Sequence, residues 1–337
     1  DIGEFKLIEN IKSWIRLKDK TKKCNKNVIG IGDDAAIIKV DPNFKNILAS
    51  IDTLVEGTHF TRETTNFYEL GWKSLAVNIS DIAAMGGIAK YALISIACPE
   101  FLKIEDLKKF YFGFQELANI ADIKLIGGDT VKSDKKIVVS ISIIGHSLGN
   151  NYFLRCGIES GDYVFSTGTF GDAAMGLRQL LKEKKTKKYF RDRFNKPMPR
   201  FEEAKILGQQ NLATAMIDVS DGLAFSLNEL ANKNKKGILI YADKIPISTY
   251  LKNEILSQKI RNFKSEKSYL DFALYGGEDY ELLFCAKKSN TDEILNKCKN
   301  ASIIGEVVNN FFGVKMIDKN NNISNISKEG YVAFKKN

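Results

Sequence analysis

The 337-residue chain is predicted to form two α/β domains, and three features of its sequence support this fold class. Its length is about twice the ~150 residues of an average domain. Apolar segments of strand length alternate with amphipathic segments of helix length in both halves. A polar, glycine-containing stretch at residues 150–161 interrupts the alternation. Domain boundaries usually fall in such stretches, so we expect domains at residues 1–149 and 150–337.

The amino-terminal half begins with apolar residues at the spacing of an amphipathic helix, namely Phe5, Ile8, Ile11 and Ile15. Further along, runs rich in β-branched residues predict strands, and runs with a period near 3.6 residues predict helices. The expected strands are 37–40, 47–51, 91–97 and 137–145, and the expected helices are 69–85 and 104–121.

The carboxy-terminal half repeats the alternation without a clean sequence period. Strands are expected at 163–166, 215–217, 238–241 and 280–286, and helices are expected to start at Asp172, Phe201, Leu223 and Thr291. The lysine-rich stretch 182–196 is interpreted as a solvated helix end and loop. Strands alternating with helices in both halves indicate α/β architecture throughout.

The composition is that of a globular protein, with 44% hydrophobic and 27% charged residues. The net charge of +9 is compatible with a nucleic acid, an anionic membrane or small anionic substrates. Its lysines are scattered, and no aromatic platform accompanies them, so we expect no nucleic-acid partner. Because there is no apolar run of ~18 residues and no signal-like start, we expect a cytoplasmic protein without a membrane partner.

The residue types available for metal binding favour a hard cation. The five cysteines are odd in number and form no C-x-x-C pair, which argues against disulfides and a zinc site. With only two histidines, metal chemistry would rest on carboxylates, and these suit Mg²⁺ better than zinc.

Carboxylates recur beside glycines and at the ends of apolar strands. The acidic segments are GDD (32–34), DTLVEG (52–57), NISD (78–81), GGDT (127–130), DVSDG (218–222) and GGED (276–279). If their side chains converge, mutual repulsion requires cations in the same site. Magnesium fits this need, because it bridges one or two carboxylates to substrate phosphates. Asp81 stands out, since it interrupts an apolar helical stretch where a carboxylate needs a partner.

Each acidic turn has an ordinary alternative, because Asp and Gly are common turn residues. Asp81 has the alternative of an exposed helix position or a cap. The segment GTFGD at 168–172 leads from a strand into a helix, so it either holds a phosphate or merely caps that helix. Two familiar nucleotide motifs are excluded: GIGDDA at 30–35 precedes a strand instead of a helix, and no P-loop sequence occurs.

The motif order GIGDDAA, DTLVEGTHF, LAVNISDIAAMGG, GGDT, TGTFGD, IDVSDGL and GGEDYELLF resembles the thiamine-monophosphate kinase family, in the superfamily of aminoimidazole ribonucleotide synthetase. The resemblance covers nearly the whole chain. It implies ATP-dependent phosphorylation of thiamine monophosphate to thiamine diphosphate, with several Mg²⁺ ions. It also implies a two-domain synthetase-like α/β fold: an amino-terminal ATP- and magnesium-binding domain whose sheet pairs in a homodimer, and a carboxy-terminal domain that completes the cleft.

The resemblance also assigns site residues. The implied magnesium ligands are Asp34, Ser50, Asp52, Asp81, Asp129, Asp218 and Asp221, among which Asp81, Asp129 and Asp221 would be catalytic. The implied nucleotide contacts are Tyr111, Gly128, Arg155 and Ser220, and the implied contacts to the thiamine part are His59, Glu278 and Tyr331. The structural alternatives are core packing for Tyr111, a surface charge for Arg155 and a structural histidine for His59.

The chain departs from the family pattern at single positions. Ile51 stands where the family often has Thr, and Ser226 and Asn228 stand where Asp and His often follow SDGL. The basic segment KPMPR at 196–200 keeps the family's pattern only in part. These changes affect single contacts and leave the reaction class unchanged.

Two other functions remain as alternatives. The nearest is another ATP-dependent enzyme of the same superfamily, such as a purine-pathway synthetase or selenophosphate synthetase. Cys24 and Lys26 lack the glycine-rich context of the latter's reactive residues. From a different class, a basic nucleic-acid-binding protein would show salt-sensitive retention on DNA or RNA and no ATP turnover.

Overall fold

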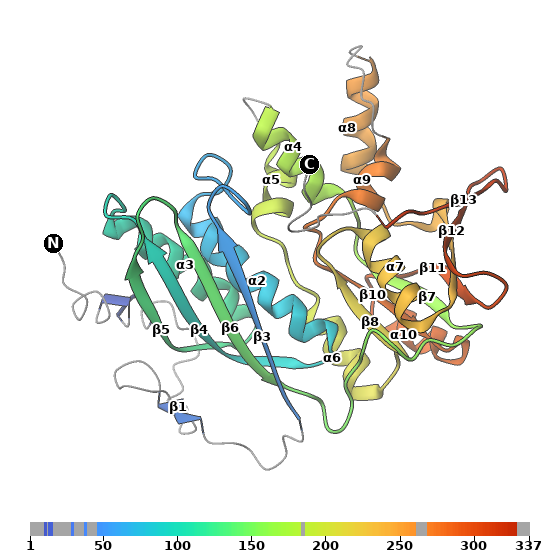
Figure 1. Cartoon of the computed structure of the whole chain (residues 1–337), viewed down its shortest axis with the longest axis horizontal. Coiled ribbons are helices and arrows are strands. Elements are labelled where there is room, and N and C mark those ends of the chain that lie inside the picture. Colours follow the sequence, from blue (N-terminus) through green and yellow to red (C-terminus); the bar gives the residue numbers. More distant parts are fainter. Residues whose placement is uncertain are drawn as a thin grey trace. The chain divides into compact units, whose positions relative to one another are not determined.

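The computed structural model describes residues 10–11, 13–15, 28–29, 37–38, 46–182, 186–260 and 268–328. The chain forms two compact units (Figure 1). Unit 1 consists of Asp1–Ile82 and Gly87–Asn150, and unit 2 consists of Ala83–Gly86 and Asn151–Asn337. No helix within the described residues is both long and apolar enough to cross a membrane.

Unit 1 is built on a four-stranded sheet with the order β3-β6-β4-β5. Its strands are β3 (Ile47–Val55), β4 (Ile88–Cys98), β5 (Lys124–Lys132) and β6 (Val138–His146). β6 pairs antiparallel with β3 and β4, whereas β5 runs parallel to β4. The short strands β1 (Val28–Ile29) and β2 (Ile37–Ile38) form a separate antiparallel pair.

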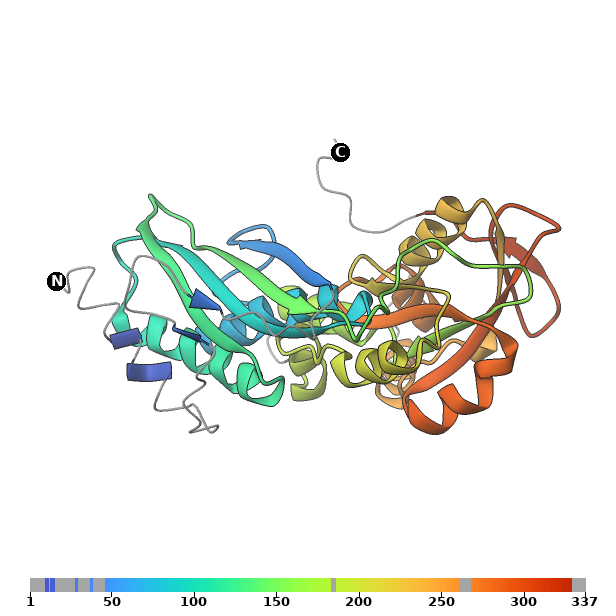
Figure 2. The ribbon, with the colours of Figure 1, turned by 90° about the horizontal axis from the view of Figure 1, so that it is seen from below.

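Two helices, α2 (Phe67–Ala84) and α3 (Ile104–Ile120), cover one face of this sheet, which we call the inner face (Figures 1 and 2). The residues of β3 alternate between the two faces, as the period of a strand requires. Ser50, Asp52 and Leu54 lie on the inner face. Ile47 and Ile51 lie on the opposite, outer face, where they are 63% and 62% exposed.

Unit 2 is built on a seven-stranded sheet with the order β13-β12-β9-β11-β7-β10-β8. All neighbouring strands pair antiparallel except β12 and β9. The strands are β7 (Tyr163–Thr167), β8 (Ala215–Val219), β9 (Gly237–Tyr241), β10 (Glu281–Ala286), β11 (Ala301–Val308), β12 (Gly313–Ile317) and β13 (Ile323–Asn325).

Helices cover both faces of the central strands of this sheet. Val164 and Ile217 belong to one apolar cluster, and their neighbours Phe165 and Met216 belong to the other. Strands buried on both faces read as continuous apolar runs, which explains why the sequence predicts them well. The helices are α4 (Asp172–Lys182), α5 (Lys188–Asn195), α6 (Phe201–Gln210), α7 (Leu223–Asn234), α8 (Thr249–Ile260), α9 (Tyr269–Tyr275) and α10 (Thr291–Lys297), with 3₁₀ turns η1 (Ala242–Lys244) and η2 (Lys288–Asn290).

The expected mixed α/β fold is confirmed, and most expected elements lie within two or three residues of the observed ones. The expected loop at 182–196 was wrong in part, since α5 occupies Lys188–Asn195. Its buried Phe190 and Phe194 give it an apolar face among the charged residues. The structure also adds elements that the sequence did not predict: β5, α8, α9 and β11 to β13.

Candidate active site

In unit 1, residues of β3 form hydrogen bonds with polar side chains of α2. The hydroxyl of Ser50 donates a hydrogen bond to Oδ2 of Asp81 over 2.5 Å. The backbone amide of Asp52 donates to Oδ1 of Asn78 over 3.0 Å. Ser50 and Asp52 are two residues apart on a strand, and Asn78 and Asp81 are three apart on a helix, so each pair shares one face. The local sequence spacing thus directs all four residues to one place, which we call the β3–α2 cluster.

The β3–α2 cluster offers hydroxyl, amide and carboxylate oxygens, which are the ligands that Mg²⁺ prefers. Within the part of the chain that the structure describes, however, no group of three or more His, Cys, Asp or Glu side chains could hold a metal ion. Magnesium usually takes only one or two carboxylates and completes its shell with substrate phosphates and water. The cluster therefore fits a magnesium ion that arrives with a nucleotide, and it does not form a complete protein cage.

Asp129 lies apart from the β3–α2 cluster. Strand register aligns Asp52, Ile141, Ile94 and Gly128 in one row across the sheet. Asp129 is the next residue and therefore points to the outer face, where it is exposed, on the edge strand opposite β3. Asp129 and Asp52 therefore lie on opposite faces of the sheet, because neighbouring residues of a strand point to opposite faces.

Gly128 has a structural reason to be glycine. A Cβ atom at this position would lie 2.1 Å from the carbonyl oxygen of Ile94, so a side chain would separate β5 from β4. The predicted contact of its backbone with a phosphate stays a prediction beside this steric requirement.

Tyr111 and His59 both make structural contacts. The ring of Tyr111 is buried on α3 and packs edge-on against Phe110. Burial, reinforced by the neighbouring Cys98, raises the pKa of its hydroxyl, which hydrogen-bonds the side chain of Thr130. Packing accounts for Tyr111, and its contact with a nucleotide stays a prediction. Nδ1 of His59 accepts a hydrogen bond from the amide of Val55 over 3.0 Å, so the neutral ring carries its proton on Nε2.

In unit 2, a second acidic group lies at the end of β8. Asp218 is the fourth residue of this strand and is buried, and Asp221 follows it in the turn before α7. Burial raises the pKa of Asp221, and the nearby carboxylate of Glu278 raises it further, whereas Arg155 opposes this effect. The carbonyl of Ser220 accepts a hydrogen bond from the amide of Glu278 over 2.7 Å. The structure therefore brings the predicted residues of this turn together with Glu278 and Arg155.

The segment GTFGD does not present a free helix end to a phosphate. The carboxylate of Asp279 accepts hydrogen bonds from the amides of Gly171 over 2.8 Å and Ala173 over 3.4 Å. The carboxyl group of Asp279 thus occupies the amino end of α4, which is where an external phosphate would bind. The alternative, that the segment's own residues cap the helix, is not what the structure shows, because the cap comes from Asp279, more than 100 positions away.

Two of the predicted site residues, Asp34 and Tyr331, lie outside the described residues. Sequence reasoning did not select Asn78 or Asp279. Asn78 had a signal, since it precedes Asp81 by three residues on the predicted helix. Asp279 belongs to the acidic segment GGED, but its contact with α4 has no sequence signal, because the two are far apart in the chain.

Family models cover most of the chain. The model of the AIR synthase related protein, N-terminal domain, matches residues 32–147. The corresponding C-terminal domain matches residues 159–316.

Several known proteins are similar to the chain over most of its length. The thiamine-monophosphate kinase of Buchnera aphidicola subsp. Acyrthosiphon pisum (strain APS) is 39% identical over 297 residues, covering 86% of this chain and 85% of that protein. The crystal structure of thiamine-monophosphate kinase from Stenotrophomonas maltophilia K279a has a TM-score of 0.79 at 31% identity, covering 94% and 96% of the two chains. The structure of AaThiL complexed with AMPPCP and TMP has a TM-score of 0.75 at 30% identity, covering 99% and 97%.

Proposed function

Because the chain belongs to the thiamine-monophosphate kinase family of AIR synthase-related proteins, we propose how its residues carry out that family's reaction. The chain transfers the γ-phosphoryl group of ATP to the phosphate of thiamine monophosphate and forms thiamine diphosphate. A related structure that holds AMPPCP and TMP supports ATP as the donor and thiamine monophosphate as the acceptor. The contact of Ser50 with Asp81 is the observation in the structure that best supports the proposed metal site.

The proposed magnesium ligands in unit 1 are Ser50, Asp52 and Asp81, with Asp129 at the opposite sheet edge and Asp34 preceding them in the chain. Asp218 and Asp221 are the proposed ligands in unit 2. When bound, magnesium supplies positive charge that offsets the repulsion between the phosphates of the two substrates. At ~4 Å, two unit charges interact by about 4 kcal/mol at an effective dielectric constant near 20. Asp81 and Asp52 contribute by holding this charge in one place.

The reaction asks little covalent chemistry of the protein. The acceptor is a phosphate oxygen, which is already anionic near neutral pH, so neither an activated nucleophile nor a strong base is needed. Positioning and electrostatic stabilisation therefore account for catalysis. We propose that residues 1–149 bind ATP and magnesium and that residues 150–337 complete the active site.

The proposed substrate contacts follow from charge. The carboxyl group of Glu278 suits the cationic thiazolium ring of the substrate, and it lies close enough to the proposed magnesium ligand Asp221 to raise the pKa of that acid. His59 and Tyr331 are proposed to assist at the thiamine part. Arg155 and Ser220 are proposed to contact the nucleotide, together with Tyr111 and Gly128.

We propose that the chain acts as a cytoplasmic homodimer joined through the outer face of the unit 1 sheet. Ile47, Ile51 and Val131 are 63%, 62% and 45% exposed there, and such exposed apolar groups favour association. Ile51→Glu should shift the protein to monomers in analytical ultracentrifugation. Leu256→Glu, at an exposed position of α8 in unit 2, is the control and should not change the oligomeric state.

The function is tested by incubating the protein with ATP, Mg²⁺ and either thiamine monophosphate or free thiamine. We expect thiamine diphosphate from the monophosphate and none from free thiamine. Turnover of neither substrate would contradict the proposal and direct attention to another acceptor used by the same superfamily.

A further inference from the structure

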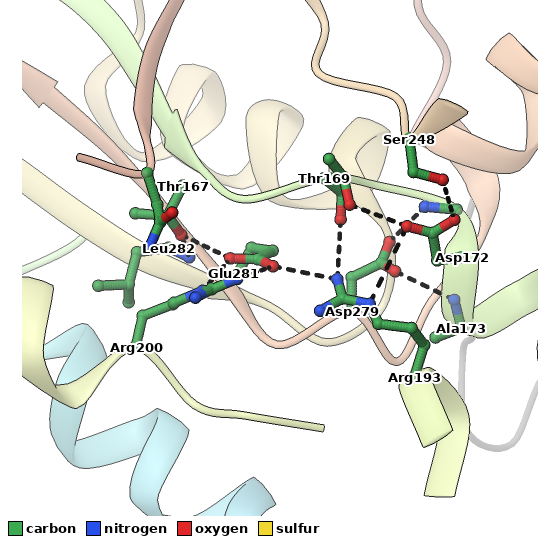
Figure 3. A network of polar contacts seen from close by, with 12 residues as sticks. Thr167, Thr169, Asp172, Ala173, Arg193, Arg200, Ser248, Asp279, Glu281 and Leu282 are labelled. Atoms are coloured by element: carbon green, nitrogen blue, oxygen red, sulfur yellow. Dashed lines mark hydrogen bonds and ion pairs between the residues drawn. The ribbon is translucent and has the colours of Figure 1, made fainter. Parts of the chain in front are cut away.

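Unit 2 contains a buried network of two arginines and three acids that the proposed reaction does not use (Figure 3). The network joins the end of β7, the start of α4, helix α5 and the turn before β10. Its charged members are Asp172, Arg193, Arg200, Asp279 and Glu281.

Glu281 anchors one side of the network. Its carboxylate accepts two hydrogen bonds from Arg200, over 2.5 and 2.7 Å, and one from Arg193 over 3.1 Å. The hydroxyl of Thr167 also donates to it over 2.8 Å. These contacts outweigh the effect of burial and hold the pKa of Glu281 below its usual value. Glu281 is therefore a fixed anion at the start of β10.

Asp279 anchors the other side. Its carboxyl group accepts hydrogen bonds from the amides of Gly171 and Ala173 at the amino end of α4. The amino end of a helix carries a partial positive charge that favours such an acceptor. Asp172 keeps its own carboxylate turned to Thr169, Tyr189 and Ser248, over 2.8, 2.9 and 2.5 Å.

Arg193 connects the two anchors. Besides its bond to Glu281, it donates to the carbonyl of Thr169 over 3.1 Å, in the loop that leads into α4. The pKa of Asp279 is raised by burial, and the positive charge of Arg193 opposes that rise. The carboxyl group of Asp279 is held by the two amides of α4, and Arg193 bonds to the carbonyl of Thr169 in the same loop.

The residues on either side of Asp279 have an unusual backbone. Glu278 and Tyr280 have φ angles of +71° and +51°, a region that side-chain-bearing residues seldom adopt. Their amides donate to the carbonyls of Ser220 over 2.7 Å and Val219 over 2.9 Å. The hydroxyl of Tyr280 donates to Oε2 of Glu278 over 3.3 Å. Strained backbone persists only where the surroundings determine it, and here Asp279 is buried between the two strained residues.

We propose that Asp279 and Arg193 are positioning residues that hold the carboxylate of Glu278 toward Asp221 for recognition of the thiamine ring. Asp279 is bonded to the start of α4 on one side, and the amide of Glu278 is bonded to Ser220, next to Asp221, on the other. This inference rests on the proposed role of Glu278 in binding thiamine monophosphate. A merely structural network would affect stability without a preference for one substrate.

The test is steady-state kinetics of Asp279→Asn, which keeps the size of the side chain and leaves one acceptor oxygen where the carboxyl group had two for the amides of α4. We expect the KM for thiamine monophosphate to rise about tenfold or more, the effect of losing a contact to a charged group. The KM for ATP and kcat should change by less than about twofold. Arg193→Lys keeps the positive charge and alters the geometry, so it should raise the same KM to a smaller extent. This second variant answers the question if the first does not fold.

Asp162→Asn is the matched control. Asp162 is another buried acid of unit 2, and it bonds to the amide of Glu159 and the hydroxyl of Thr214. It makes no contact with the turn at Glu278 among the described residues. Its variant should change stability and leave the KM for thiamine monophosphate unchanged. If Asp162→Asn and Asp279→Asn alter the kinetics equally, the positioning role is wrong.

A double-mutant cycle with Glu278→Gln separates this inference from the proposed function. If Asp279 acts through Glu278, adding Asp279→Asn to Glu278→Gln should raise the KM no further. A KM effect of Glu278→Gln without one of Asp279→Asn would overturn the positioning role and leave the proposed function standing. No effect of Glu278→Gln, in an enzyme that still turns over, would overturn both the role of Glu278 and the inference built on it.

Discussion

The β3–α2 cluster of unit 1 and the buried network of unit 2 both keep acids partly or wholly away from water, but they surround them with different groups. In the network, Glu281 accepts hydrogen bonds from Arg200 and Arg193, and Asp279 accepts hydrogen bonds from the amides at the start of α4. In the cluster, the carboxylate of Asp81 accepts a hydrogen bond from the neutral hydroxyl of Ser50.

The difference separates two uses of the same residue type. The acids of the network have their hydrogen bonds supplied by the chain itself, which suits groups that hold the fold of unit 2 in one arrangement. For the acids of the cluster, we propose that magnesium and nucleotide complete the charge balance.

Neutralising an acid of the cluster should have the largest effect on catalysis. We expect Asp81→Asn to lower kcat by about 10²-fold or more, since a preorganised electrostatic group is lost. The circular dichroism spectrum and melting temperature should stay close to those of the wild type. Wild-type turnover in this variant would contradict the catalytic role proposed for the β3–α2 cluster.

Asp129→Asn tests how far the cluster extends. Asp129 lies on the outer face and the opposite sheet edge, yet the family resemblance makes it a catalytic metal ligand. We expect a loss of kcat similar to that of Asp81→Asn, with intact folding. If only Asp81→Asn loses activity, the metal site is confined to the inner face of unit 1.

Breaking the network should instead lower stability. Arg200→Met leaves Glu281 buried with one arginine fewer, and we expect a loss of about 3–5 kcal/mol in the free energy of unfolding, as for other buried pairs. Lys132→Met is the control, because Lys132 and Glu100 form an exposed ion pair whose loss should change stability far less. Urea denaturation measures the free energy of unfolding of both variants. Equal losses would show that burial does not determine how much an ion pair contributes to stability.

The pH dependence of stability tests the burial of Asp279. Burial raises the pKa of Asp279 to about 8 in the folded chain, against its ordinary value of 3.8. The folded state therefore binds this proton more tightly, and the stability it contributes is complete below pH ~4 and is lost as the pH rises through about 8. The charged groups that act on Asp279 are Arg193, Asp172 and Glu281. They are present in both the wild type and Asp279→Asn, so the comparison of the two proteins isolates the proton of Asp279.

The stability difference between wild type and Asp279→Asn should consequently fall with rising pH, by about 1.4 kcal/mol per unit between roughly pH 5 and 7. Denaturation curves across this range provide the measurement. A difference that stays constant with pH would show that Asp279 is already ionised in the folded protein.

The smallest expected effect concerns the backbone at Glu278. Because its φ is +71°, Glu278→Gly should be more stable than Glu278→Ala by about 1 kcal/mol, although both lose the carboxylate. Thermal unfolding of the two variants provides the comparison. Equal melting temperatures would show that the turn relaxes without the side chain.

Much of the fold could be predicted from sequence, because burial leaves a local pattern. β7, β8, β9 and β10 read as apolar runs since they are buried on both faces, and the helices between them have clear periods. β5 was not predicted, because Gly127 and Gly128 interrupt its apolar run. The terminal strand β13 is exposed throughout, so it has no such pattern.

The candidate site was predictable only where local spacing decides it. The spacing of Ser50 and Asp52 places them on one face of a strand, but their contact with α2 depends on how helix and sheet pack. For Asp129, the face follows from strand register, which no short segment determines. The bond of Asp279 to α4 joins residues more than 100 positions apart, beyond the reach of any motif.

The central claim is that the β3–α2 cluster binds magnesium with nucleotide, whereas the acids of the network do not. Calorimetric titration of AMPPCP in the presence and absence of Mg²⁺ tests this on the wild type, Asp81→Asn and Asp279→Asn. We predict that Mg²⁺ strengthens nucleotide binding to the wild type and to Asp279→Asn, and that this gain disappears in Asp81→Asn. An equal gain in all three proteins, or its loss in Asp279→Asn alone, would contradict the claim.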